Sequence, residues 1–359
     1  MLNFDYSDGF YYASLSPCER GIFTRMKNRI LIFSIIICVG VLACIGFAAD
    51  LWLYANKPIS ANAENLSVLL EPGQSFAKTV KILEEKGLIK SPFRFSLISR
   101  FKGYDKKVQA GEYLLSKSMT PLQILEKMTK GEVKLYKLTI PEGLNLYQIA
   151  ELASKGGFAE KAEFIEAATD KAYTREKGIE ADTFEGYLFP DTYFFPRGTS
   201  ARKIIGTMVD RFRSVFTPQW SEQAKRMGFT PHQVVILASI IEKETGDPSE
   251  RPVISSVFHN RLKKKMRLES DPTVIYGIKN FDGNLTRKHL TTRTPYNTYM
   301  IRGLPAGPIA NPGIKSLEAA LYPAQTPYIY FVSKKDRTHH FSTNLKDHNK
   351  AVRKYQLRH

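Results

Sequence analysis

The stretch TPHQVVILASIIEKETG, residues 230–246, predicts the central helix of the main domain of this chain. Thr230 is a favourable N-cap, and Pro231 suits the first helical position. Residues 232–241 are apolar almost all round, so we expect this helix to be buried. It runs directly into Glu242-Lys243-Glu244, which places two carboxyl groups at the end of a buried apolar helix.

These two glutamates are the candidates for acid chemistry. Burial raises the pKa of a carboxyl group toward the range in which it donates a proton at neutral pH, as cleavage of a glycosidic bond requires. Glu242 continues the helical stripe of Ala238, whereas Glu244 continues the stripe of Ile241, so periodicity does not choose between them. The alternative is an ordinary helix end, at which both glutamates are solvated and Lys243 favours the helix dipole.

Segments after this helix carry polar and aromatic groups in rigid contexts. Residues 255–262 are expected to form a helix, and Asp271-Pro272-Thr273 is able to cap another one, with Asp or Thr as the acceptor. The loops 294–299 and 303–313 are rich in Pro and Gly and hold amide, hydroxyl and aromatic groups. Loops of this kind tend to line sites.

An aromatic segment precedes the helix, FEGYLFPDTYFFP at residues 184–196. Aromatic faces and acids are the groups that carbohydrate sites use, but the same composition also makes a loop packed on a core. On composition alone we favour the packed loop.

The amino-terminal region contains the strongest physical signal for a membrane. Residues 30–49 form twenty positions without one charge, enough for a helix to cross the roughly 30 Å hydrocarbon core. Arg25, Lys27 and Arg29 precede this run, and Trp52 follows it, so the positive-inside rule puts the amino terminus in the cytoplasm. We therefore expect a cytoplasmic tail at 1–29, a transmembrane helix at 30–52, and the rest outside the cytoplasmic membrane. The alternatives are a cleaved signal that starts at Met26 and lipidation at Cys44.

Outside the membrane the chain is predicted to be of the α+β class. A polar linker, 53–65, leads to a small α+β module at 66–135, where strand, Pro-Gly turn and helix alternate. This pattern suggests ligand or cell-wall binding, as in LysM-type units, and a spacer packed on the next domain is an equal alternative. The strand, Pro, Gly and helix pattern recurs at 138–158, where Leu138-Thr139-Ile140-Pro141-Glu142-Gly143 opens a larger mixed α+β domain, 136–359.

Composition narrows the class of protein. The 359 residues include 52 Lys and Arg against 35 Asp and Glu, a net charge of +17, which excludes an acidic protein but fits nucleic acid, an anionic membrane face or an acidic polymer equally. An exported domain argues against nucleic acid. All three cysteines lie in the first 44 residues, which excludes a disulfide scaffold or a Cys-based zinc site for the main body. His339, His340 and His348 are read as solvated, so no metal or cofactor is expected.

Six motifs occur together in order: LASIIEKET, SSVFHNRL, MRLESDPTVIYG, TPYNTY, GLPAGPIANPG and YFVSKKDRTHHFSTNLKDHN. Together they resemble the bacterial YceG-like family of endolytic murein transglycosylases, over residues 66–350. In that family the first Glu of EKET is the catalytic residue, so the resemblance, and not periodicity, favours Glu242 over Glu244. Ala306, where a second Pro is usual, and His339-His340, where Gly-His is usual, depart from the pattern.

The resemblance implies a lytic transglycosylase. Such an enzyme cuts the MurNAc-β-1,4-GlcNAc bond of nascent peptidoglycan strands near the membrane, leaves 1,6-anhydro ends, and works beside glycan-polymerising synthases such as penicillin-binding proteins. Candidates for the walls of the cleft are the residues of the matching motifs whose groups suit sugar hydroxyls, namely Asn260, Asp271, Thr273, Tyr296, Asn297 and Tyr299; each is equally able to brace a loop. The alternative class is a non-catalytic peptidoglycan-binding scaffold for synthases, which a missing acid would favour.

Overall fold

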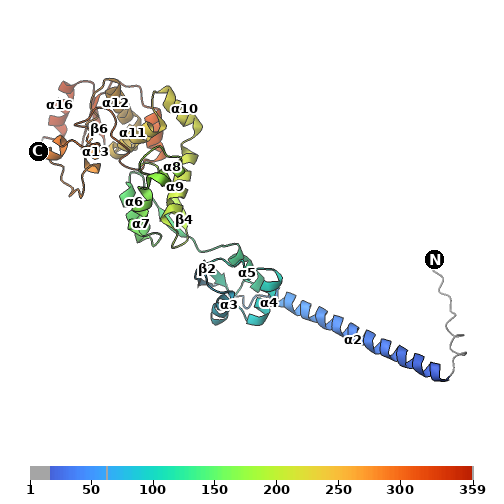
Figure 1. Cartoon of the computed structure of the whole chain (residues 1–359). Coiled ribbons are helices and arrows are strands. Elements are labelled where there is room, and N and C mark those ends of the chain that lie inside the picture. The colour runs from blue at the N-terminus through green and yellow to red at the C-terminus, as the bar shows by residue number, and fades with distance from the viewer. Residues whose placement is uncertain (1–16, 62–63, 358–359) are drawn as a thin grey trace. The chain divides into compact units, whose positions relative to one another are not determined.

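The computed structural model describes residues 17–61 and 64–357. Contacts within the chain divide it between Lys134 and Leu135 into two compact units (Figure 1). Both mix helices with short antiparallel strands, so the α+β class is confirmed.

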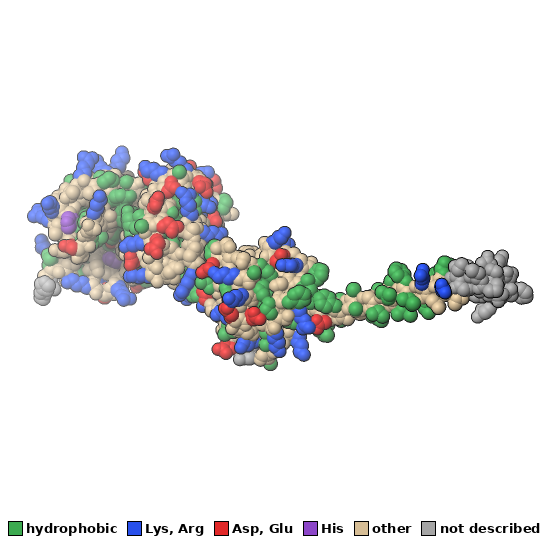
Figure 2. All heavy atoms as spheres, turned by 60° about the horizontal axis from the view of Figure 1, so that its bottom comes forward, with side chains coloured by type: hydrophobic (Ala, Val, Ile, Leu, Met, Phe, Trp, Pro, Cys, Tyr) green, Lys and Arg blue, Asp and Glu red, His purple; other side chains and the backbone are tan. Residues whose placement is uncertain are grey.

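A single long helix, α2, runs from Pro17 to Asn56. Its part from Thr24 to Asn56 is long and apolar enough to cross a membrane, and many of its side chains are hydrophobic, with Lys and Arg side chains next to the grey amino-terminal residues (Figure 2). The helix continues past Trp52 to Asn56 without a break, so residues 53–56, expected in the linker, are helical. Leu51 and Ala55 are buried against the small unit, which explains why the helix persists there.

The small unit contains β1 (Asn65–Leu70), α3 (Phe76–Glu85), α4 (Pro92–Phe101), β2 (Gly111–Ser116) and α5 (Pro121–Thr129). The two strands pair antiparallel, with Leu70 opposite Gly111. The side chains of Ser75 and Thr120 cap α3 and α5, as the sequence indicates. Helix α4 was not predicted; Ser91 caps it and Phe95 anchors it in the core.

The large unit contains sixteen elements: β3 (Tyr136–Thr139), α6 (Leu146–Lys155), α7 (Lys161–Ala168), α8 (Lys171–Glu176), β4 (Thr192–Phe195), α9 (Ala201–Val215), α10 (Pro218–Arg226), α11 (Pro231–Glu244), the 3₁₀ turn η1 (Pro248–Glu250), α12 (Arg251–Lys263), α13 (Asp271–Tyr276), α14 (Arg287–Thr291), α15 (Ile314–Leu321), β5 (Tyr330–Ser333), β6 (His339–Ser342) and α16 (Leu345–Tyr355). Strand β3 pairs with β4 and β5 with β6, both antiparallel.

Helix α11 is the buried centre of this unit, as the sequence predicts. Thr230 closes a capping box with Gln233, and every residue from Val234 to Ile241 is buried. The helix packs against α10, α12, α13 and α15 (Figure 1). The Ser239 hydroxyl accepts a hydrogen bond from the Ile309 N–H at 3.0 Å, which ties the loop before α15 to the helix.

The aromatic segment 184–196 is packed except at Phe194, which is exposed. Phe184, Tyr187, Phe189, Tyr193 and Phe195 are all buried in the same core as α11. The packed-loop interpretation therefore describes this segment.

Candidate active site

The carboxyl end of α11 separates the two candidate glutamates. Residues two positions apart on an α-helix point roughly 200° apart, so Glu242 and Glu244 face different surroundings. Each therefore defines a site of its own: the Glu242 site, made by Glu142, Glu242, Arg251 and Gly313, and the Glu244 cleft, described below.

The Glu242 carboxylate is held by a backbone donor and a cation. Its Oε2 accepts a hydrogen bond from the Gly313 N–H at 3.0 Å. Its Oε1 lies 3.7 Å from Nη2 of Arg251, at the start of α12, and the two side chains are only 9% and 11% exposed. An N–H donor and a guanidinium both stabilise a negative charge on this carboxyl group. These contacts give Glu242 a fixed position and a partner for its ionised form.

A second carboxyl group, that of Glu142, meets Glu242 at Gly313. A Cβ atom on Gly313 would overlap the Glu142 carboxyl group, so any larger residue at this position requires that carboxyl group to move. Burial and then the nearby charge of Glu242 raise the pKa of Glu142, while Arg251 lowers it. The Glu142 carboxyl group therefore lies close enough to Glu242 for their charges to interact.

Backbone bonds hold the Glu142 turn against the loop before α15. The Gly143 N–H donates to the Asn311 carbonyl at 2.9 Å, and the Asn311 N–H donates to the Leu144 carbonyl at 2.8 Å. The Lys243 ammonium donates to the Gly143 carbonyl at 3.3 Å. The Pro-Glu-Gly turn after β3, the end of α11 and the Asn-Pro-Gly loop are thus joined at one place.

Beneath this junction lies a buried carboxyl group, that of Glu185, which is 2% exposed. It accepts hydrogen bonds from the Leu146 N–H, from the Asn311 amide at 2.9 Å and from the Tyr276 hydroxyl at 3.0 Å. Burial raises the pKa of Glu185 to about 7, although these donors lower it. Glu185 therefore braces the Asn-Pro-Gly loop from inside the core.

The Glu244 cleft is a cavity of about 440 Å³. Its lining includes Glu244, Arg261, Glu269, Asp271 and Tyr299. The Ser270 hydroxyl donates to Glu244 Oε1 at 2.5 Å. Burial, and to a smaller extent Asp271, raise the pKa of Glu244 to about 7, while the Ser270 bond lowers it. The raised pKa expected at the end of the helix is thus found on Glu244.

Of the six expected sugar contacts, Asp271, Tyr296 and Tyr299 are exposed or partly exposed, as is Asn260, whose amide is already bonded. Asp271 and Tyr299 line the Glu244 cleft, where the tyrosine hydroxyl donates to Asp271 Oδ1 at 2.7 Å. Tyr296 is half-buried, and its ring lies 4.8 Å from that of Tyr276, on the side of Glu185. Ser270, and not Asp271 or Thr273, occupies the N-cap position of α13, and its side chain makes no capping hydrogen bond because its hydroxyl donates to Glu244.

The other three are internal braces in this structure. The Asn260 amide donates to the carbonyls of Thr326 and Tyr328, at 2.8 and 2.9 Å. The amide of the fully buried Asn297 donates to three carbonyls at the end of α14, those of His289, Leu290 and Thr292. The buried Thr273 hydroxyl donates to the Ser270 carbonyl at 2.6 Å. Their polar groups are thus already in use, which fits the loop-brace alternative.

The histidines near the carboxyl terminus differ in surroundings. His339 Nδ1 lies 2.7 Å from Glu250 Oε2, so this ring is paired rather than solvated. Within 17–61 and 64–357, no group of three or more His, Cys, Asp or Glu side chains is arranged to hold a metal ion.

Sequence reasoning did not identify Glu142, Glu185, Arg251 or Gly313 as site residues. The signals for two of them were present, since the Pro-Glu-Gly turn and the Asn-Pro-Gly loop both stand out as rigid segments. Glu185 is an acid inside an apolar aromatic segment, which is the mark of a buried, hydrogen-bonded carboxyl group. Nothing in the sequence singles out Arg251.

Comparisons with known proteins identify the class. The model of the YceG-like family matches residues 68–354. The chain is 34% identical over 316 residues to an endolytic murein transglycosylase of Bacillus subtilis, which covers 83% of this chain and 87% of that protein. It is 29% identical to one from Streptococcus pneumoniae, over 82% of this chain and 59% of that longer protein.

A solved structure agrees with this. A YceG-like protein of Listeria monocytogenes has a TM-score of 0.55 and 35% sequence identity, and the match covers 80% of this chain and 99% of that one. This chain belongs to the YceG-like family.

Proposed function

We propose that this protein is a lytic transglycosylase that cleaves the MurNAc-β-1,4-GlcNAc bonds of peptidoglycan strands, with Glu242 as the catalytic residue. Relatives named endolytic murein transglycosylases support the activity. The observation that carries the assignment to Glu242 is its setting between the Gly313 N–H and the Arg251 guanidinium. Both partners stabilise the carboxylate form of Glu242, which is the form that accepts a proton in the second step of the reaction.

In the proposed reaction one carboxyl group acts twice. Protonated Glu242 gives its proton to the glycosidic oxygen, the bond from C1 of MurNAc to that oxygen breaks, and GlcNAc leaves with a hydroxyl group. The Glu242 carboxylate, stabilised by Gly313 and Arg251, then takes the proton of the C6 hydroxyl as O6 bonds to C1. The product is a 1,6-anhydro end, and Glu242 is protonated again.

The Glu244 cleft is the competing location for the acid, because a raised pKa in a cleft is also typical of catalytic acids. Unlike Glu242, Glu244 has a hydroxyl donor and no backbone N–H partner among the hydrogen bonds described here. We assign Asp271 and Tyr299, which line this cleft, and the half-exposed Tyr296 to glycan binding.

We further propose that α2 anchors the protein in the cytoplasmic membrane, with the amino terminus in the cytoplasm and both units outside. Arg25, Lys27 and Arg29 at the amino-terminal side support this orientation. The small unit, in which two helices connect paired antiparallel strands, is proposed as a LysM-like module. Nascent peptidoglycan strands near the membrane are the proposed substrate of this protein. Peptidoglycan synthases are its proposed partners.

The test compares Glu242→Gln with Glu244→Gln, a matched change two residues away. The full chain in detergent is incubated with isolated peptidoglycan, and the products are identified by mass spectrometry. We expect wild type to release fragments lighter by one water molecule than hydrolytic products, and Glu242→Gln to lower the rate about 10²- to 10⁴-fold.

Glu244→Gln and Asp271→Asn are expected to lower the cleavage rate less than Glu242→Gln does. If Glu244→Gln abolishes cleavage and Glu242→Gln does not, the acid is Glu244. Reducing ends in place of anhydro ends would identify a hydrolase, which generally needs two carboxyl groups. Binding without cleavage by wild type would favour the scaffold.

A further inference from the structure

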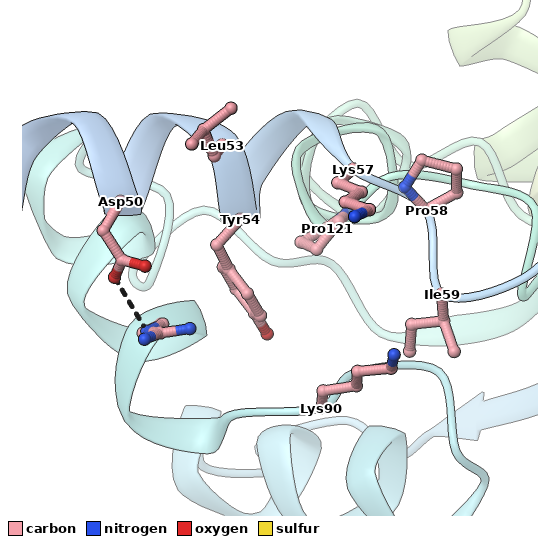
Figure 3. A pocket seen from close by; sticks show the side chains of 9 residues that line it. Asp50, Leu53, Tyr54, Lys57, Pro58, Ile59, Lys90 and Pro121 are labelled. Atoms are coloured by element: carbon pink, nitrogen blue, oxygen red, sulfur yellow. Dashed lines mark ion pairs between the residues drawn. The ribbon is translucent and has the colours of Figure 1, made fainter.

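A pocket in the small unit lies at the outer end of α2. It has a volume of about 270 Å³ and is bounded by α2, the segment that follows it, and the start of α4 (Figure 3). Its lining residues are Asp50, Leu53, Tyr54, Lys57, Pro58, Ile59, Lys90, Arg94 and Pro121. Tyr54 points from α2 into the space, and Lys90 lies across it (Figure 3).

The lining is cationic and partly pre-arranged. Lys57, Lys90 and Arg94 supply three positive charges, and Asp50 one negative charge. Asp50 Oδ2 pairs with Arg94 Nε at 3.1 Å, and the guanidinium lies 5.8 Å from the centre of the Tyr54 ring. The Tyr54 hydroxyl in turn donates to the Ser91 carbonyl at 3.1 Å. Arg94 is therefore oriented, whereas neither Lys57 nor Lys90 has an acidic partner among the ion pairs of the residues that the structure describes.

The position of the pocket along α2 indicates how far it lies from the hydrocarbon core of the membrane. If the uncharged run that ends at Ala49 fills the hydrocarbon core, Asp50 is the first residue beyond it. At about 1.5 Å per residue, Tyr54 is roughly 6 Å and Lys57 roughly 10 Å beyond Asp50. The headgroup layer of one leaflet is about 5–8 Å thick. Asp50 and Tyr54 thus lie within the headgroup layer, and Lys57 lies somewhat further out, with a side chain long enough to reach back to the lipid phosphates.

Exposed apolar side chains surround this position. Trp52 and Leu53 on α2 are 66% and 58% exposed, and Phe93 and Phe101 on α4 are 68% and 76% exposed. Large apolar groups beside Lys and Arg are the usual composition of a surface that sits in the membrane interface. α4 packs on α2, so the two sets lie on neighbouring helices.

We propose that this pocket binds the phosphate of an anionic phospholipid headgroup from the outer leaflet, through Lys57, Lys90 and Arg94. Headgroup binding seats the small unit on the bilayer, in addition to the span itself. The inference rests on the proposed membrane anchor and is independent of the chemistry at Glu242. Free phosphate shares the same chemistry, and the test distinguishes the two sources.

The experiment is native mass spectrometry of the full chain in detergent with equal amounts of phosphatidylglycerol and phosphatidylcholine. We expect wild type to retain phosphatidylglycerol preferentially, and Lys57→Gln with Lys90→Gln to lower that retention at least tenfold. Lys106→Gln with Lys107→Gln, which removes the same charge from exposed positions outside the pocket lining, is the matched control. The double Lys→Arg variant keeps the charge and should restore binding.

Equal retention of both lipids by wild type, or an unchanged preference in the Gln double variant, would overturn the proposal. If millimolar inorganic phosphate displaces the lipid, the claim that the pocket is specific for a lipid phosphate would be overturned. Murein cleavage by the same samples is measured in parallel, and we expect it to be unchanged in the lysine variants. If the wild-type protein does not cleave murein, the proposed transglycosylase activity is rejected, but the proposed lipid site is not. Extraction of the chain by alkaline carbonate would reject the anchor.

Discussion

The Gly313 N–H donates a hydrogen bond to the Glu242 carboxylate at 3.0 Å, across 71 residues of sequence. This contact fixes the end of the buried helix α11 against the Asn-Pro-Gly loop. It also brings Glu142 to the same point, since that carboxyl group occupies the space where a Gly313 side chain would stand.

Replacing Gly313 with Ala is expected to damage the site more than the fold. The added methyl group must displace the Glu142 carboxyl group and shift the N–H that binds Glu242. Misplacement of a catalytic group by about 1 Å costs about 10²-fold in rate. The measurement is the cleavage rate beside the melting temperature. Gly206→Ala, on α9, is the control, because its methyl group would meet the Tyr173 hydroxyl at 3.2 Å and the Lys177 side chain, which belong to neither site. Equal rates for the two variants would contradict the proposed site.

Arg251 should matter through its charge. Arg251→Gln removes the cation beside the carboxylate that forms when Glu242 gives up its proton, so we expect a rate about tenfold to hundredfold lower. Arg251→Lys keeps the charge but not the planar fork and should recover part of the loss. Steady-state rates on isolated peptidoglycan test this; a Lys variant as slow as the Gln variant would show that shape, not charge, is what counts.

Glu185 predicts a pH dependence of stability in the large unit. Its pKa of about 7 in the fold exceeds the ordinary 4.5, so between these pH values the folded state holds a proton that the unfolded state has released. The free energy of unfolding therefore falls as pH rises from about 4.5 to 7, by on the order of 3 kcal/mol for this group.

Urea unfolding of residues 135–359 at pH 4.5 and pH 7.5 measures this difference. Glu185→Gln should remove that part of the dependence, because the amide does not titrate and the Tyr276 hydroxyl is able to turn and accept from it. An unchanged dependence in the variant would rule out Glu185 as its source.

Tyr299 tests whether the Glu244 cleft binds glycan. Tyr299→Phe removes the hydroxyl that bonds Asp271, and loss of one sugar contact should raise KM about fivefold while kcat changes little. Tyr355→Phe, on α16, is the control. A fall in kcat with constant KM would place Tyr299 in the reaction step, and no change in either would make it a brace.

The sequence predicted the features that depend on local patterns. Helix α11 with its Thr230 cap, the apolar helix α2 and the α+β class follow from periodicity and capping rules, and the structure confirms them. Helix α4 was missed because its apolar face is weak: Phe93 and Phe101 point outward.

The site depended on contacts between distant segments, which local patterns do not encode. Glu185 meets Asn311 across 126 residues, and the pairing of Arg251 with Glu242 depends on how α12 returns along α11. Asn297 and Thr273 have groups suited to sugars, but the fold uses those groups for carbonyls within its own loops. Residue type alone did not distinguish the two uses.

α2 enters the core of the small unit through Leu51 and Ala55 without a break. The helix therefore transmits any rotation about its axis from its apolar part to the small unit. One residue inserted before Asp50 would lift that unit by about 1.5 Å and turn it by about 100° about the helix axis. Such a rotation would turn α4, with Phe93 and Phe101, away from the membrane surface that these side chains are proposed to contact. The number of residues between the membrane and the small unit therefore sets a rotational phase as well as a height, and a full extra turn should be tolerated better than a single extra residue.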